Sequence, residues 1–250
     1  MSGHSKWSSI RHKKGAADAK RGKLFSKLAR AIIVAAKEGG PDPANNLALQ
    51  NAIEKARSLS MPKENIDRAI AKGSGAGTDS ESFETIVYEG YGPEGVAVLV
   101  EALTDNRNRT ASEVRHLFAK HGGNLGATGA VTWQFERRGV VVVGDGADEE
   151  DLLLVAADGG ADDVEEDGSV FQVTSAPEAL ASVRQAIEAA GFTIESAELQ
   201  MVPKTIVSVE EEAKARQVMR LVDALEENDD VQDVYANFDI PERILEAVAG

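Results

Sequence analysis

Hydrophobic side chains at helical spacing dominate the start of the chain. Over residues 18–38, apolar residues recur every three or four positions, which predicts one amphipathic helix ended by the Gly-Gly-Pro sequence at 39–41. A second helix is predicted over 43–59 and a third from residue 61, where Pro follows Met, because proline suits a first helical turn. A helical N-terminal domain is therefore predicted over residues 1–73, followed by a linker rich in Gly, Ser and Thr.

Beyond the linker the pattern changes to alternation. Residues 84–91 and 96–103 read as two strands of a hairpin. A helix follows, and the spacing of Thr110 and Glu113 has the form of a capping box, which predicts that the helix starts there. A further strand is predicted over 130–136.

Residues 139–202 form a βαββαβ pattern. The predicted strands are 139–144, 161–166, 169–174 and 192–202, and the predicted helices are 149–158 and 177–190. An Asp-Gly pair at 167–168 supports the central hairpin, because a type I′ turn requires positive φ at both positions. This order predicts a ferredoxin-like fold.

The last elements are a helix over about 209–227 and a strand over 231–238. They can complete the sheet that begins at residue 84. We therefore expect an α+β protein of three domains: an N-terminal basic helical domain, a discontinuous α/β middle domain (79–138 with 203–250) and an inserted ferredoxin-like βαββαβ domain (139–202).

Charge divides the chain at the same place. The first 37 residues carry ten Lys/Arg and one acid, Asp18, whereas the whole chain has a net charge of −15. Residues 1–72 sum to +9, which leaves −24 for the remainder. Five cations at helical spacing span an arc of about 100° on the first predicted helix; this basic stripe consists of Lys20, Lys23, Lys27, Arg30 and Lys37. A solvated helix face is the alternative, but the scarcity of acids favours phosphate binding.

We expect nucleic acid to be contacted by the N-terminal cations and by a second cluster at 106–110. The candidate residues are Lys6, Trp7, Arg11, Lys13, Lys14, Lys20, Arg21, Lys23, Lys27, Arg30, Arg107 and Arg109. Trp7 could stack on a base or cap the helical core. Arg107 and Arg109 stand at a predicted helix N-terminus, a setting for phosphate, with salt bridges to the acidic domain as the alternative.

Several kinds of chemistry find no support in the sequence. The chain has no cysteine, which excludes disulfides and thiolate sites, and its four histidines lack metal-ligand spacing. The G-x-G-x-x-G sequence at 90–95 precedes a predicted strand instead of a helix, so a hairpin turn is the better interpretation. The acidic stretch 145–167 lacks the calcium-loop pattern and is interpreted as a solvated face. No metal, cofactor or enzymatic activity is expected.

The N-terminus has no apolar segment that resembles a membrane span or a signal peptide. A cytoplasmic protein with no membrane partner is expected. A basic, Ser-containing start is also compatible with a mitochondrial transit peptide, which is the alternative.

Several blocks of sequence together resemble one family. They are GHSKW at 3–7, DAKRGKLFSKL at 18–28, MPKENIDRAI at 61–70, YEGYGPEGVAVLVEALTDNRNRT at 88–110, GGNLG at 122–126 and DDVQDVYANFDI at 229–240. On these blocks the chain is similar to the YebC/PmpR family, which includes the mitochondrial translational activator of cytochrome oxidase subunit one. The resemblance implies three domains, no known enzymatic activity, and a role in DNA-binding transcriptional regulation or on translating ribosomes.

The expected function is a non-enzymatic, nucleic-acid-binding regulator of gene expression, with DNA as the family's usual target. The alternative is a ribosome-associated translation factor that contacts ribosomal RNA and relieves stalling. No helix-turn-helix is evident, and an acidic body disfavours broad contact with duplex DNA. An enzyme is the third alternative, and would require a pocket with facing titratable groups. A monomer is expected.

Overall fold

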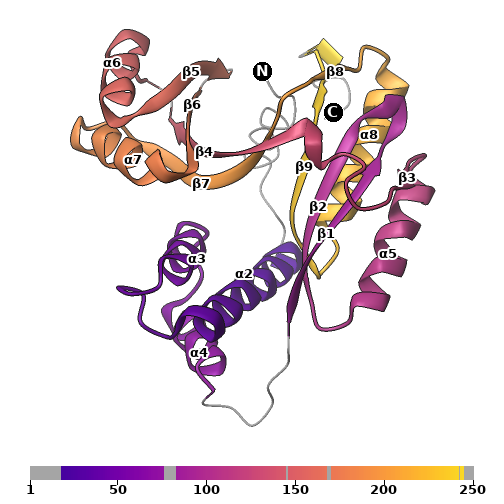
Figure 1. Cartoon of the computed structure of the whole chain (residues 1–250), viewed down its shortest axis with the longest axis horizontal. Helices are drawn as coiled ribbons and strands as arrows, with labels where there is room; N and C mark the ends of the chain where they lie inside the picture. The colour runs from indigo at the N-terminus through magenta and orange to yellow at the C-terminus, as the bar shows by residue number, and fades with distance from the viewer. Residues whose placement is uncertain (1–17, 76–82, 145, 168–169, 242, 245–250) are drawn as a thin grey trace.

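The computed structural model describes residues 18–75, 83–144, 146–167, 170–241 and 243–244 of the chain. Three units are visible in Figure 1, which we call the helical, middle and third units. The predicted arm residues Lys6, Trp7, Arg11, Lys13 and Lys14 lie outside the described residues, as does part of the predicted linker. No helix within the described ranges is both long enough and apolar enough to cross a membrane.

The helical unit consists of α2 (Asp18–Gly39), α3 (Leu47–Ser58) and α4 (Lys63–Gly73). Its buried apolar face includes Ile32, Leu49 and Ile66. The second helix starts later than predicted, because the Asn46 side chain accepts a hydrogen bond from the Leu49 N–H and caps the helix there. The core of this unit shares no residue with the cores of the other two.

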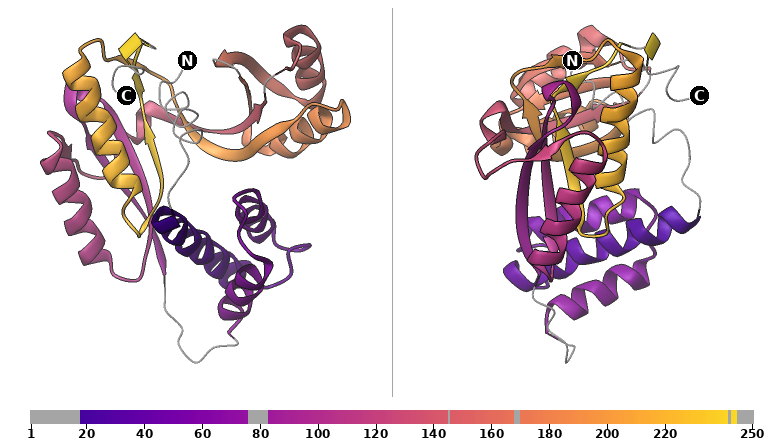
Figure 2. Two further views of the ribbon diagram at one scale, coloured as in Figure 1. Left: turned by 180° about the vertical axis from the view of Figure 1, so that it is seen from behind. Right: turned by 90° about the vertical axis from the view of Figure 1, so that its right-hand side faces the viewer.

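The middle unit is a four-stranded sheet in the order β3-β1-β2-β9. Its strands are β1 (Glu84–Tyr91), β2 (Ala97–Thr104), β3 (Asn124–Leu125) and β9 (Val231–Ala236). Helices α5 (Arg107–Lys120) and α8 (Glu212–Glu226) pack on one face, over a core that includes Phe118 and Leu221 (Figure 2). Since β9 pairs with β2, the end of the chain completes the sheet begun at residue 84, as predicted.

Between β1 and β2 the chain makes a short turn, η1 (Pro93–Gly95), so the glycine-rich sequence is a hairpin connection, as predicted. Gly95 has a φ of +75°, a conformation that favours glycine. A two-stranded parallel sheet, β8 (Val207–Ser208) with β10 (Phe238–Asp239), lies beside this unit.

Two element boundaries, at the start of α5 and at the strand expected over 130–136, were predicted wrongly. Helix α5 begins at Arg107, since Asn106 is its N-cap and accepts from the Arg109 N–H. Thr110 is therefore inside the first turn and fully buried, so the predicted capping box does not exist. The strand expected over 130–136 begins only at residue 135, after the turn η2 (Thr132–Gln134).

The third unit has the predicted βαββαβ order. It comprises β4 (Phe135–Val143), α6 (Glu149–Gly159), β5 (Ala161–Asp167), β6 (Val170–Ser175), η3 (Pro177–Ala179), α7 (Leu180–Ala189) and β7 (Ile194–Pro203). The strand order is β5-β6-β4-β7 and all neighbours are antiparallel, which is the ferredoxin-like arrangement. The α+β class with an inserted unit is thus confirmed. The long strands β4 and β7 lead into and out of it (Figure 1).

Candidate nucleic-acid interface

The basic stripe of α2 meets the middle unit at the end of α8. Lys23 and Lys27 donate to the backbone carbonyls of Glu227 and Glu226, which end α8. The last carbonyls of a helix have no partner within it and carry the negative end of its dipole, so cations are favoured there. Part of the stripe therefore contacts protein, which neither interpretation of the sequence anticipated.

Asp230 is the centre of this joint. Its side chain is 3% exposed and its two oxygens accept from different units. Arg30 of the helical unit donates to Oδ1 at 2.8 Å, while Arg109 and Thr110 of the middle unit each donate to Oδ2 at 2.7 Å. Thr104 adds a longer bond of 3.2 Å. One buried carboxylate thus ties α2 to α5.

The electrostatics of Asp230 follow from these donors. Burial alone would raise the pKa of its carboxyl. Hydrogen bonds from Arg109 and Thr110 and the charges of both arginines outweigh burial and hold that pKa below its ordinary value. Asp230 is therefore ionised at neutral pH.

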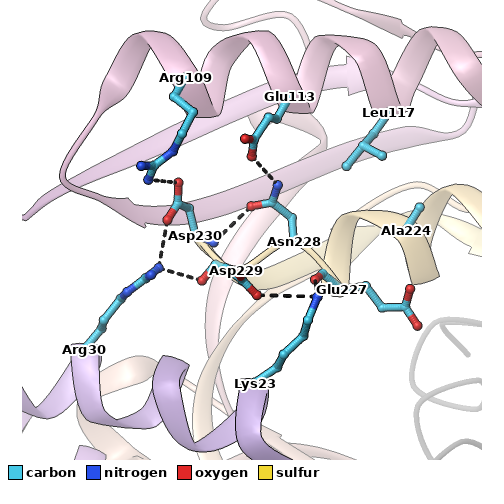
Figure 3. Close-up of a pocket in the computed structure, with 10 residues that line it drawn as sticks. All are labelled: Lys23, Arg30, Arg109, Glu113, Leu117, Ala224, Glu227, Asn228, Asp229 and Asp230. Atoms are coloured by element: carbon cyan, nitrogen blue, oxygen red, sulfur yellow. Dashed lines mark hydrogen bonds and ion pairs between the residues drawn. The ribbon is translucent and has the colours of Figure 1, made fainter. Parts of the chain in front are cut away.

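A cleft of about 500 Å³ opens beside this carboxylate. Figure 3 shows Lys23 and Arg30 approaching from α2 and Arg109 and Glu113 from α5, with the segment 227–230 between them. Asn228 donates to Glu113 at 2.8 Å, and Lys23 lies 3.6 Å from the Asp229 carboxylate. Because acids and cations alternate around it, the cleft is a polar joint and not a basic pocket.

The second predicted cluster divides in the structure. Arg109 makes salt bridges to Asp105 and Asp230, the alternative considered for it. Its pKa is raised, chiefly by the hydrogen bond to Asp230. Arg107 is exposed, and its backbone carbonyl accepts a hydrogen bond from the Tyr88 hydroxyl at 3.4 Å. Both arginines are exposed at the helix start, but Arg109, whose side chain is 42% exposed, is held by two carboxylates.

Charged contacts also join the helical unit to the third unit. The Lys55 ammonium lies 2.9 Å from Glu198 of β7 and 3.3 Å from Asp233 of β9, so it bridges all three units. The charge of Asp233 is the main reason that the pKa of Lys55 is raised. Arg184 of α7 pairs with Glu54 of α3. The interfaces of the helical unit therefore depend strongly on ion pairs.

Other cations of the helical unit remain exposed. Lys37, Arg57, Lys63 and Arg68 come from all three of its helices. Lys37 belongs to the predicted basic stripe, but none of the four is among the predicted nucleic-acid contacts, which follow the densest run of charge in the sequence. Lys20 and Arg21 lie in α2, with side chains outside the described part of the chain. Among the described residues, no three His, Asp or Glu side chains come together as a metal site.

These features define a class: a three-unit α+β protein in which a cation-rich helical unit is attached by charged contacts to an acidic body. Residues 5–76 match the TACO1/YebC protein N-terminal domain, and residues 83–238 match the TACO1/YebC second and third domain. The chain belongs to the TACO1/YebC family.

Similar proteins match this chain over almost their whole length. A protein of Rubrobacter xylanophilus is 57% identical, covering 100% of both chains, and one of Geobacter sulfurreducens is 53% identical, covering 98% of this chain and 99% of that one. Both are named "Probable transcriptional regulatory protein". The crystal structure of a conserved hypothetical protein from Aquifex aeolicus has a TM-score of 0.83 at 52% identity, covering 91% of this chain and 94% of that chain. At family level, the names of the relatives support a regulator.

Proposed function

We propose that this protein is a non-enzymatic regulator of gene expression that binds nucleic acid through its helical unit. The observation that carries the proposal is the segregation of charge onto a separately packed unit. Residues 1–72 carry +9 on a body of −24, and this unit has its own core. A polyanion is attracted to one end of such a molecule and repelled from the other.

The exposed cations are the best candidates for phosphate contact. Lys37, Arg57 and Lys63 reach solvent from three different helices, whereas Arg30 is mostly occupied by Asp230. Lys23 is intermediate, since its side chain is 59% exposed while it contacts the end of α8. We propose that the exposed set contributes most of the phosphate contacts and that Arg30 chiefly holds the units together.

DNA is the first candidate target, in keeping with the names of the relatives. Ribosomal RNA is the second, and a specific observation favours it: a body of −24 would be repelled by the long, uniform phosphate backbone of duplex DNA, whereas a folded RNA can offer a local site. In that case the protein would act as a translation factor on the ribosome.

Competition between the two targets tests the proposal. Labelled protein is bound to purified ribosomes over a range of salt concentrations, with and without excess random duplex DNA. Binding that survives the competitor assigns the primary role to translation. Binding that is lost to the competitor shows general phosphate affinity and leaves transcriptional regulation ahead. If the protein binds neither ribosomes nor DNA at low salt, the proposed function is wrong.

A further inference from the structure

Trp133 is an exposed indole in the middle of the body. Its side chain is 63% exposed, although Val131, Gln134 and Phe135 beside it in the sequence are buried. Tryptophan carries the largest apolar surface of any side chain, so leaving it in water gives up substantial burial free energy. The two predicted nucleic-acid-binding clusters, at the N-terminus and at 106–110, do not explain why this indole is exposed.

The loop before Trp133 is held unusually firmly. Glu89 is 4% exposed, and its carboxylate accepts three backbone N–H groups, from Gly129, Val131 and Thr132, at 2.7–2.8 Å. The Glu89 carbonyl also accepts from the Gly126 N–H at 2.7 Å. A buried carboxylate satisfied in this way fixes the backbone that leads into η2.

The orientation of the ring is fixed as well. The indole N–H donates to the Ala130 carbonyl at 3.1 Å, and the Tyr91 hydroxyl donates to the same oxygen at 2.9 Å. The polar edge of the indole is thereby satisfied inside the protein. What remains for a ligand is the ring itself, held in place before any partner arrives.

Apart from the buried Glu89, the two sequence stretches that meet at Trp133 carry no acid, although the protein is otherwise acidic. No Asp or Glu occurs over residues 114–135 or 199–209, although residues 73–250 contain 36 acids. The two stretches meet at this site, because the Lys204 N–H donates to the Gln134 carbonyl at 2.7 Å and Met201 packs beside Phe135. Lys204 is exposed, so the neighbourhood of the indole carries a cation.

We infer that Trp133 is a stacking platform for an unpaired nucleobase, with Lys204 beside it for the adjoining phosphate. This inference rests on the proposed function and adds a second contact, on the body, to the one on the helical unit. An exposed aromatic ring stacks on any base, whereas paired bases are unavailable for it, so the site selects looped or single-stranded segments.

The test compares Trp133→Ala and Trp133→Phe with the wild type on two probes, a 15-nucleotide single-stranded poly(U) RNA and a 15-base-pair duplex RNA. We expect Trp133→Ala to weaken binding of the single strand by roughly 5- to 150-fold, the range for one base stacked on an aromatic ring, and to leave duplex binding unchanged. Trp133→Phe keeps a ring and should remain within a few-fold of wild type. Leu154→Ala is the matched control, since that side chain is 67% exposed but lies in the acidic third unit.

Fluorescence gives an independent readout. The chain has two tryptophans, so in a Trp7→Phe background the emission comes from Trp133 alone. Poly(U) should quench this emission and protect it from acrylamide, and the duplex should do neither. If Trp133→Ala binds the single strand like wild type, or loses both probes equally, the inference is wrong and the indole serves another partner, such as a protein. If wild type binds neither probe, the proposed function fails together with the inference.

Discussion

Replacing Asp230 by Asn removes one charge from the joint between the helical and middle units and changes little else. The carboxylate accepts from Arg30 through one oxygen and from Arg109, Thr110 and Thr104 through the other. The Asn amide has a single oxygen, and more hydrogen bonds are kept when this oxygen accepts from the three donors of the middle unit. Its NH₂ group then faces the Arg30 guanidinium, so the contact between the two units is the one that breaks.

The magnitude follows from these bonds. A hydrogen bond to a charged group contributes about 1.5–3 kcal/mol, and Asp230→Asn loses one such bond and weakens another. Both arginines can turn to solvent, since their side chains are 24% and 42% exposed, which reduces the loss. We expect the free energy of unfolding to fall by about 2 kcal/mol at pH 7.

Asp229→Asn is the matched control. It makes the same chemical change one residue away, but that side chain is 61% exposed and its carboxylate lies 3.6 Å from Lys23. An exposed pair of this kind contributes less than about 0.5 kcal/mol. Urea unfolding followed by circular dichroism measures both variants, and an Arg30→Ala, Asp230→Asn double-mutant cycle isolates the bond between the units.

The pH dependence of the effect of Asp230→Asn on stability can refute this reasoning. Because the pKa of folded Asp230 is below its ordinary value of 3.8, its contribution is fully present above that value and is lost as the pH falls through the folded pKa. The stability gap between wild type and Asp230→Asn should be constant from about pH 7 to pH 5 and narrow below about pH 4. An unchanged gap at pH 3, or equal effects of the two Asn variants, would refute the reasoning.

Three further predictions concern other charged contacts. Glu89→Gln leaves a single acceptor oxygen for three backbone N–H groups and should lower the free energy of unfolding by about 1–3 kcal/mol in urea melts at pH 7. The pKa of Glu89 is lowered, because those three N–H groups outweigh the burial that would raise it, so this difference should shrink below about pH 4. Arg184→Glu faces Glu54 with a like charge and should increase the radius of gyration in X-ray scattering, while adding Glu54→Arg should restore most of the compact form. Lys55→Met removes the cation beside Asp233 and should reduce the melting temperature more at pH 8 than at pH 4.5. Burial and the charge of Asp233 raise the pKa of Glu101 above its ordinary 4.5, so at pH 4.5 its carboxyl is largely protonated and the repulsion from Asp233 is weaker.

Local patterns explain why so much of the fold could be predicted. Apolar spacing predicted α2, and the two strands on either side of the Asp-Gly pair, whose glycine lies outside the described residues, helped to predict the third unit. Each of these signals depends only on residues close together in the sequence. The errors occurred where a tertiary contact decides. Thr110 resembles a helix cap in sequence, but its hydroxyl bonds Asp230, 120 residues away, and Asn106 is the cap.

The candidate site was less predictable for the same reason. The sequence shows which helix carries the cations, but only the fold shows that Arg30 meets Asp230 and that Lys37 does not lie in this joint. Trp133 gave no signal of its own, because an aromatic residue before a strand is usually buried. Its exposure depends on the loop that Glu89 holds, 44 residues earlier.

The salt dependence of binding tests the central claim most directly. Each phosphate contact contributes about −0.9 to the slope of log affinity against log salt on duplex DNA. The test variant replaces three exposed cations of the helical unit with Ala: Lys37, Arg57 and Lys63. The control variant replaces three exposed cations of the middle unit with Ala: Arg115, Lys120 and Arg220. Both change the net charge equally. On a random 20-base-pair DNA, we predict that the first variant flattens the slope by about 2–3 and the second by less than about 0.5. Equal slopes for the two variants would contradict nucleic-acid binding through the helical unit.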